Sequence, residues 1–206
     1  MYARSTTITA QPDKVDAGIA NVRDEVMPQV RAMDGCVGLS MVVDRSSGRS
    51  IVTTAWRSEE AMHASAQGVM PIREKAAQLV GGQTSVEEWE VAYVHREHQA
   101  GEGACSRVSW MTFGPSKSQE VIEMFRSTIM PKVRELDGFC SCSLFVNDAE
   151  GRGCITATYD SRDAMVAARD AAMGLRADMV QQLGMKVEEV AEFELCLAHL
   201  DVPELV

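Results

Sequence analysis

The chain has 206 residues and a formal net charge of −10, from 30 acidic and 20 basic side chains. This charge argues against nucleic acid as a partner, because phosphate binding requires a basic surface. No apolar run approaches the roughly 20 residues that span a bilayer, and the first ten residues lack the apolar stretch of a signal peptide. We therefore expect a soluble, cytoplasmic protein that binds neither nucleic acid nor membranes.

The first half of the chain predicts strands and helices in the order β-α-β-β-α-β, which is the ferredoxin-like arrangement. Apolar residues at helical spacing predict helices over 15–33 and 59–80. Pro28 should kink the first helix, and Gly68 and Pro71 should interrupt the second. Segments rich in β-branched or alternating apolar residues predict the strands: 4–10, 37–43, 50–56 and 86–94.

The second half repeats the first at a fixed offset of 103 residues, as from Met27 to Met130. The clearest copies are MPQVRAMDG, which ends at Gly35, and MPKVRELDG, which ends at Gly138. A fixed long offset indicates a duplicated domain. We expect one repeat at 1–94, a polar linker with two glycines at 95–104, and a second repeat at 105–206.

Apolar residues on both strand faces predict how the repeats associate. In the first strand of the second repeat, Val108 and Trp110 alternate with Met111 and Phe113. A sheet that is covered by helices on one side only would have a polar second face. The expected fold class is therefore α+β, with two ferredoxin-like repeats packed sheet to sheet as one intramolecular barrel. Such a barrel is complete in a monomer, and further homo-oligomerisation stays open.

Two segments in each half carry a resemblance to a known family. The first is a helix ending in P-x-x-R-x-x-D-G, and the second is a strand ending in an aromatic residue followed by Ser-x-(Glu/Asp)-Ala-Met. They lie at Pro28–Gly35 with Ala55–Met62, and at Pro131–Gly138 with Tyr159–Met165. The pattern resembles the antibiotic-biosynthesis monooxygenase (ABM) superfamily, whose fold is the dimeric α/β barrel, present here as a tandem duplication.

The resemblance implies a protein that binds a small aromatic or polyketide-like molecule, with cofactor-independent monooxygenation, an oxidoreductase reaction, as one activity. The alternative is a non-catalytic small-molecule binder or a structural member of the superfamily. Haem-degrading members carry a tryptophan early in the second helix and an iron-binding histidine about nine residues later. The matching positions here are Ser65 and Glu74, and Ala168 and Ala177 in the second repeat. We therefore expect no haem and no other cofactor.

A cofactor-free oxygenase needs a base to form the substrate anion and a cation to hold an oxyanion. His63 is the candidate base, since it is the only histidine within a predicted element of the first half. Arg73 is the candidate oxyanion partner. The alternative interpretation is an exposed histidine and a solvated arginine on a helix. Val166 takes the place of His63 in the second repeat, so at most one pocket would use this base.

Four further residues are candidates for substrate binding. Trp56, Trp110 and Tyr159 could line a site for a flat aromatic molecule, although aromatic residues in strands more often belong to the core. Arg176 occupies the position of Arg73 in the second repeat and could likewise bind an oxyanion, or lie in solvent near the helix end.

The six cysteines share no pattern between the repeats, so they predict no disulfide framework. Cys140 and Cys142 should share one strand face, with Cys154 as a potential neighbour. A metal site there is the less favoured alternative, because zinc sites usually bring paired spacings and histidines. His95 and His98 lie in the linker, where we expect them to be solvated. We therefore expect no bound metal.

Overall fold

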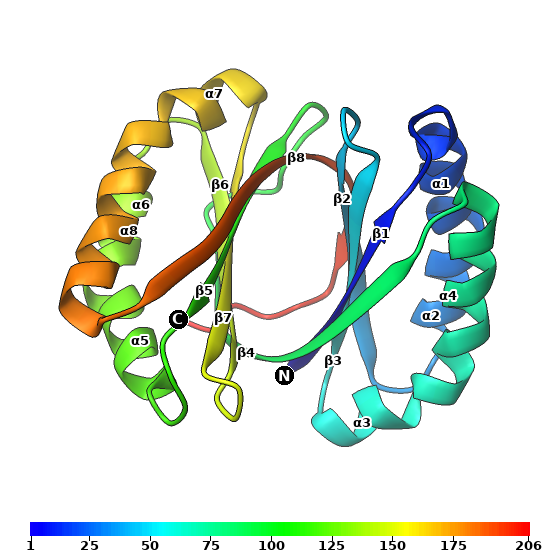
Figure 1. Ribbon diagram of the computed structural model, residues 1–206, viewed down its shortest axis with the longest axis horizontal. Helices are drawn as coiled ribbons and strands as arrows, with labels where there is room; N and C mark the ends of the chain where they lie inside the picture. Colours follow the sequence, from blue (N-terminus) through cyan, green and yellow to red (C-terminus); the bar gives the residue numbers. More distant parts are fainter. The chain divides into compact units, whose positions relative to one another are not determined.

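The structure is a computed structural model that describes residues 1–206 (Figure 1). None of its helices combines the length and the apolar character needed to cross a membrane. The strands are β1 (Tyr2–Thr9), β2 (Cys36–Asp44), β3 (Arg49–Trp56), β4 (Thr84–Arg96), β5 (Cys105–Thr112), β6 (Phe139–Asn147), β7 (Arg152–Tyr159) and β8 (Lys186–Leu200). The α-helices are α1 (Val15–Asn21), α2 (Met27–Arg31), α3 (Glu59–Ala64), α4 (Ala66–Val80), α5 (Ser118–Met124), α6 (Met130–Val133), α7 (Arg162–Ala167) and α8 (Arg169–Leu183).

Two compact units make up the chain. The first unit comprises Met1–Trp89 with Glu194–Val202, and the second comprises Glu90–Phe193 with Pro203–Val206. Strands β4 and β8 therefore contribute residues to both units. The hydrogen-bonded strand order is β1-β3-β2-β8-β5-β7-β6-β4, a closed barrel. This topology, with the β-α-β-β-α-β order in each repeat, confirms the predicted fold class.

In the first unit, β3 is the central partner of an antiparallel sheet. It pairs with β1 from Tyr2↔Trp56 to Thr9↔Arg49, and with β2 on its other side. The residues of β8 from Glu194 onward pair with β2. Helices α1, α2 and α4 lie along one face of this sheet (Figure 1). The core between them contains apolar side chains of both layers, among them Ile8, Leu39, Met41, Val43 and Val80.

The second unit repeats this arrangement with bulkier side chains. Strand β7 pairs with β5 and with β6, and β6 pairs with β4 from Glu90↔Val146 to Arg96↔Ser141. Helices α5, α6 and α8 cover one face of the sheet (Figure 1). Its core is larger than that of the first unit and includes Met111, Phe113, Met124, Phe125 and Met179.

Both predicted helix irregularities exist, but one lies elsewhere than expected. A π-helical turn, Val22–Val26, precedes Pro28, and another, Phe125–Ile129, precedes Pro131. A wider turn fits a proline that has no N–H to donate and that crowds the preceding carbonyl groups. The break in the second helix falls at Ser65, and Pro71 is accommodated inside α4. The expected interruption at Gly68 and Pro71 is therefore wrong.

The two segments of the family motif contact each other in both repeats. Gly35 ends the first helix with a φ of +78°, and a Cβ added there would lie 2.5 Å from the Cβ of Ala61. Ser58 caps α3 by accepting a hydrogen bond from the backbone N–H of Ala61. Gly138 repeats this contact with Ala164. The glycine is thus required both for its left-handed conformation and for the close approach of an alanine.

Gly138→Ala should destabilise the chain, because Gly138 has a φ of +71° and its added Cβ would lie 2.7 Å from the Cβ of Ala164. We expect the free energy of unfolding, measured by urea denaturation, to fall by roughly 2–4 kcal/mol from conformational strain and overpacking. Gly174→Ala in α8 is the control, since nothing lies within 4 Å of its added Cβ. The control should keep or gain stability, and an unchanged Gly138→Ala variant would contradict the packing argument.

Candidate functional site

A buried arginine organises the polar groups of the first unit. Arg4, on β1, is only 3% exposed. Its Nε donates to Glu88 Oε1 at 2.8 Å, and its terminal nitrogens donate to Ser65 Oγ at 3.0 Å and to the backbone oxygen of Met62 at 2.8 Å. Sequence reasoning missed Arg4 and Glu88. The recurrence of Arg4 as Arg107, at the same offset and within an apolar strand, is the signal that could have found them.

His63 and Arg73, the predicted catalytic residues, both lie near this Arg4–Glu88 pair. His63 Nε2 is 3.3 Å from Glu88 Oε2, and its side chain is 56% exposed. Arg73 is partly buried, and its Nε lacks a hydrogen-bond partner. Burial first, and then the charge of Arg4, lower the pKa of Arg73. Glu88 therefore contacts both the solvent-facing imidazole of His63 and the guanidinium group of Arg4, and its charge also acts on Arg73.

Trp56, the predicted wall residue, is fully buried. Its ring packs with Val30, Met62 and Val69, and its Nε1 donates to Thr54 Oγ1 at 3.0 Å. The ring presents no surface to solvent, and its polar atom is satisfied within the protein. Trp56 therefore belongs to the core beneath α3.

The second unit repeats the buried arginine but changes its surroundings. Arg107 donates to Glu192 Oε1 at 3.0 Å and to the backbone oxygen of Met165 at 2.6 Å, while one terminal nitrogen is buried without a partner. Its guanidinium carbon lies 5.8 Å from the centre of the Tyr159 ring. Burial first, and then the charge of Arg107, lower the pKa of Arg176. Arg169 adds a second cation, 2.8 Å from Glu192.

The second cluster differs from the first in the candidate residues that it contains. Val166, at the position of His63, is an exposed apolar residue, so the second cluster has no imidazole. Trp110 is 8% exposed and stands opposite Cys154 in the ladder between β5 and β7. The structure thus brings Tyr159 and Arg176 to the same arginine, Arg107, and places His63 and Arg73 in the matching cluster of the first unit.

A small cavity lies between the sheet and the helices α1 and α4 of the first unit. Its volume is about 20 Å³, close to the space for a single water molecule. No lining residue is titratable. Asn21 and Ser50 are its polar residues, and the hydroxyl of Ser50 donates a hydrogen bond to the backbone oxygen of Ile8. The lining includes several small side chains: Ala10, Gly18, Asn21, Ser50 and Ala76.

The second repeat carries larger residues at most of these positions. At the offset of 103 residues, Ala10, Gly18, Asn21 and Ala76 correspond to Phe113, Val121, Met124 and Met179. All four larger side chains are buried in the core of the second unit. The two repeats therefore differ where a ligand would enter the layer between sheet and helices: the first has small side chains there, and the second fills the space.

The chain is similar to a known family model and to known sequences. The family model described as antibiotic biosynthesis monooxygenase matches residues 1–69. Two uncharacterized proteins of Mycobacterium tuberculosis strain H37Rv match the whole chain. One is 50% identical over 206 residues, with 92% of its own length covered, and the other is 51% identical over 207 residues, with 88% covered.

Solved structures support the fold. An anthrone oxidase-like protein aligns with a TM-score of 0.69 at 15% identity, covering 99% of this chain and 95% of that one. A heme-degrading enzyme from Listeria monocytogenes aligns with a TM-score of 0.55 at 10% identity, covering 94% and 99%. At these identities the likeness shows the fold alone. The family model matches most of the first repeat, and the second repeat carries the same motif segments, so the chain belongs to the antibiotic biosynthesis monooxygenase family.

Proposed function

We propose that the first repeat binds a small aromatic or polyketide-like molecule between its sheet and the helices α1 and α4, and oxygenates it without a cofactor. The observation that carries the proposal is the difference between the repeats. Four lining residues of the first, Ala10, Gly18, Asn21 and Ala76, correspond to larger residues that are buried in the core of the second: Phe113, Val121, Met124 and Met179. The fold does not require this difference, since both repeats build the same sheet and helices.

The cavity and the polar cluster lie along one interface, which supports a ligand with an apolar and a polar end. Arg4 and Ile8 are separated by four residues on β1 and so share one strand face. Arg73 and Ala76 are separated by three residues on α4 and so share one helix face. Ile8 and Ala76 line the cavity. A flat molecule with its rings in the cavity would therefore extend its oxygen atoms towards the two arginines.

In this proposal His63 is the base and Arg73 holds the oxyanion. His63 would remove a proton from a phenol or an activated carbon, and Glu88, 3.3 Å away, would orient the imidazole. Arg73, with its partnerless Nε, would stabilise the anion. The anion would then react with dioxygen. The O–O bond would break, one oxygen atom would form a C=O bond at the substrate carbon, and the other would leave as water with the two hydrogens that the substrate loses. The substrate would thus supply all four electrons.

Trp56, Trp110, Tyr159 and Arg176 were the remaining candidates for substrate contact. Of these, Trp56 belongs to the first repeat, and we propose that it supports the site from the core side of α3. Tyr159 and Arg176 are the matching pair of the second repeat around Arg107. Since one chain supplies all eight strands, we propose a monomer as the functional unit.

The size of the cavity favours a second candidate, a non-catalytic or structural family member. Ligand pockets usually measure about 300–1,000 Å³, whereas this cavity is about 20 Å³. Binding of a ring system therefore requires α1 or α4 to move away from the sheet. If no such movement occurs, the layer between sheet and helices serves only as a core.

A thermal-shift experiment with polycyclic phenols, quinones and haem separates the two candidates. We expect a flat phenol or quinone at a hundred times its dissociation constant to raise the melting temperature by roughly 5–10 °C. Ala76→Met, which installs the residue found at the matching position of the second repeat, should abolish the shift by filling the cavity. Leu79→Met on the exposed side of α4 is the control and should preserve it. If no compound shifts the wild-type protein, the structural alternative is favoured.

The roles of His63 and Arg73 can be tested with any compound that turns over. We expect His63→Ala to lower kcat for oxygen consumption by about 100-fold, as the loss of a general base does, with a smaller change in KM. Val166→Ala, the same change at the matching exposed position of the second repeat, should leave kcat unaltered. Equal kcat values for wild type and His63→Ala would end the proposal that His63 is the base.

A further inference from the structure

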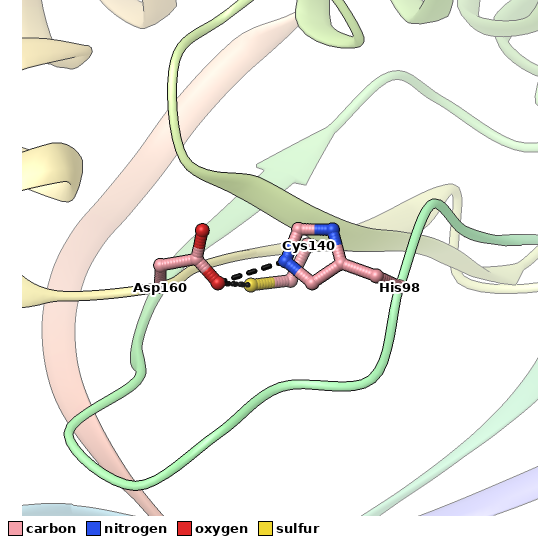
Figure 2. Close-up of side chains that lie close together, drawn as sticks. All are labelled: His98, Cys140 and Asp160. Atoms are coloured by element: carbon pink, nitrogen blue, oxygen red, sulfur yellow. Dashed lines mark hydrogen bonds and ion pairs between the residues drawn. The ribbon is translucent and has the colours of Figure 1, made fainter.

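Three potential metal ligands from separate segments meet in the second unit (Figure 2). His98 lies in the loop after β4, Cys140 lies in β6, and Asp160 follows β7 directly. Asp160 Oδ1 is 2.8 Å from His98 Nε2 and 3.1 Å from Cys140 Sγ. All three ligand atoms lie within 4.8 Å of one another. His98 is exposed, as expected for a residue of the linker, and its imidazole also contacts Asp160.

Backbone hydrogen bonds hold these three segments together. The backbone N–H groups of Glu97 and His98 both donate to the carbonyl oxygen of Cys140, at 2.8 and 3.4 Å, and that of Asp160 donates to Gly138 at 2.8 Å. The three side chains therefore meet on a frame that does not depend on their own contacts. Such pre-positioning reduces the conformational entropy lost when a ligand is bound.

A β-bulge places the thiol. The pairing of β6 with β7 shifts between Phe139 and Ser141, which leaves Cys140 as the extra residue. A bulge redirects side chains relative to regular alternation. Consequently Cys142 packs in the apolar core, whereas the Cys140 thiol lies against Asp160. The expectation that the two cysteines share one strand face is therefore wrong.

The fold itself does not require these residues. The first repeat has the same register shift between Cys36 and Gly38, so Val37 occupies the bulge there. At the offset of 103 residues, Arg57 takes the place of Asp160. The bulge is thus common to both repeats. The thiol and the carboxylate occur at these positions only in the second repeat, where His98 from the loop lies beside them.

We propose that His98, Cys140 and Asp160 bind one divalent transition metal ion, for which Zn²⁺ is the best match. Thiolate, imidazole and carboxylate are the three ligand types of zinc, with bond lengths of about 2.0–2.3 Å that put tetrahedral ligand atoms roughly 3–4 Å apart. Mg²⁺ and Ca²⁺ take oxygen ligands and do not suit this set. A thiolate and a carboxylate together neutralise the charge of the ion.

The cluster is open on one side, which leaves a place for a fourth ligand. Cys140 is fully buried, whereas the side chains of His98 and Asp160 are 45% and 49% exposed. The thiol therefore lies at the base, and the other two ligands form the rim. Without metal, the thiol S–H of Cys140 donates a hydrogen bond to Asp160 Oδ1 at 3.1 Å. The metal takes the place of that proton, and the fourth position is left to water.

The ion would join the loop between the repeats to the second sheet. His98 belongs to the segment that connects β4 to β5, while Cys140 and Asp160 belong to β6 and the end of β7. A bound ion thus converts one ion pair and one weak hydrogen bond into three coordinate bonds. We expect the loop to become resistant to proteolysis when the metal is present.

Cobalt titration of the full-length, untagged chain, after treatment with a chelator, tests the site. We expect a thiolate-to-cobalt charge-transfer band in the near ultraviolet that saturates at one equivalent of Co²⁺ and disappears when Zn²⁺ is added. Cys140→Ser should remove the band. His98→Ala, on an exposed loop, and Asp160→Asn should each weaken Co²⁺ binding at least about tenfold by removing a ligand.

Two matched variants serve as controls. Cys142→Ala removes the neighbouring cysteine of the same strand, and His199→Ala removes another exposed histidine; both should keep the band and its stoichiometry. The proposal is overturned if wild-type protein shows no band at one equivalent, if the band survives in Cys140→Ser, or if Cys142→Ala loses it while circular dichroism shows an intact fold. Its outcome is independent of oxygenase activity, since none of these residues belongs to the first unit's polar cluster.

Discussion

The fold depends on one buried charge in each repeat. An arginine on the first strand, Arg4 or Arg107, is almost entirely removed from water, which costs several kcal/mol unless the charge is paired and hydrogen-bonded. The pairing carboxylate comes from the last strand of each repeat, and the backbone oxygen of Met62 or Met165 accepts a further hydrogen bond. These oxygens are available because the second helix breaks there. The helix break, the register of the last strand and the position of the carboxylate are thus linked through one guanidinium group.

The motif segments carried the resemblance to the family, and sequence periodicity was sufficient for the repeats and the element order, because these depend on local patterns. Periodicity failed where a contact between residues far apart in the sequence determines the local structure. Gly68 and Pro71 are strong local helix breakers, yet the break falls at Ser65, whose hydroxyl binds Arg4 from β1. Periodicity also assumes strict alternation along a strand, so it placed Cys140 and Cys142 together and could not foresee the bulge.

The candidate site was predictable only in part, for a similar reason. His63 and Arg73 stand out in the sequence as a histidine and an arginine on an amphipathic helix. Their common neighbour Glu88 lies in a strand with several other glutamates, and nothing local distinguishes it. His95 was expected in solvent but is buried against Glu97 and stacked on Phe139. A charged residue in a polar segment gives no indication of which distant partner will cover it.

Duplication has let the two copies diverge at different places, the layer between sheet and helices in the first and the bulge in the second. Strands β4 and β8 tie the two copies together, since each strand starts in the unit of its own repeat and ends in the other unit. Each unit therefore contains the end of a strand that belongs to the other repeat. In a homodimer that exchanged strand ends in this way, both copies would come from one gene and would have the same sequence. In one polypeptide the two repeats are always made together and in equal amounts. Each repeat can therefore change in sequence while the other still supplies its strand end.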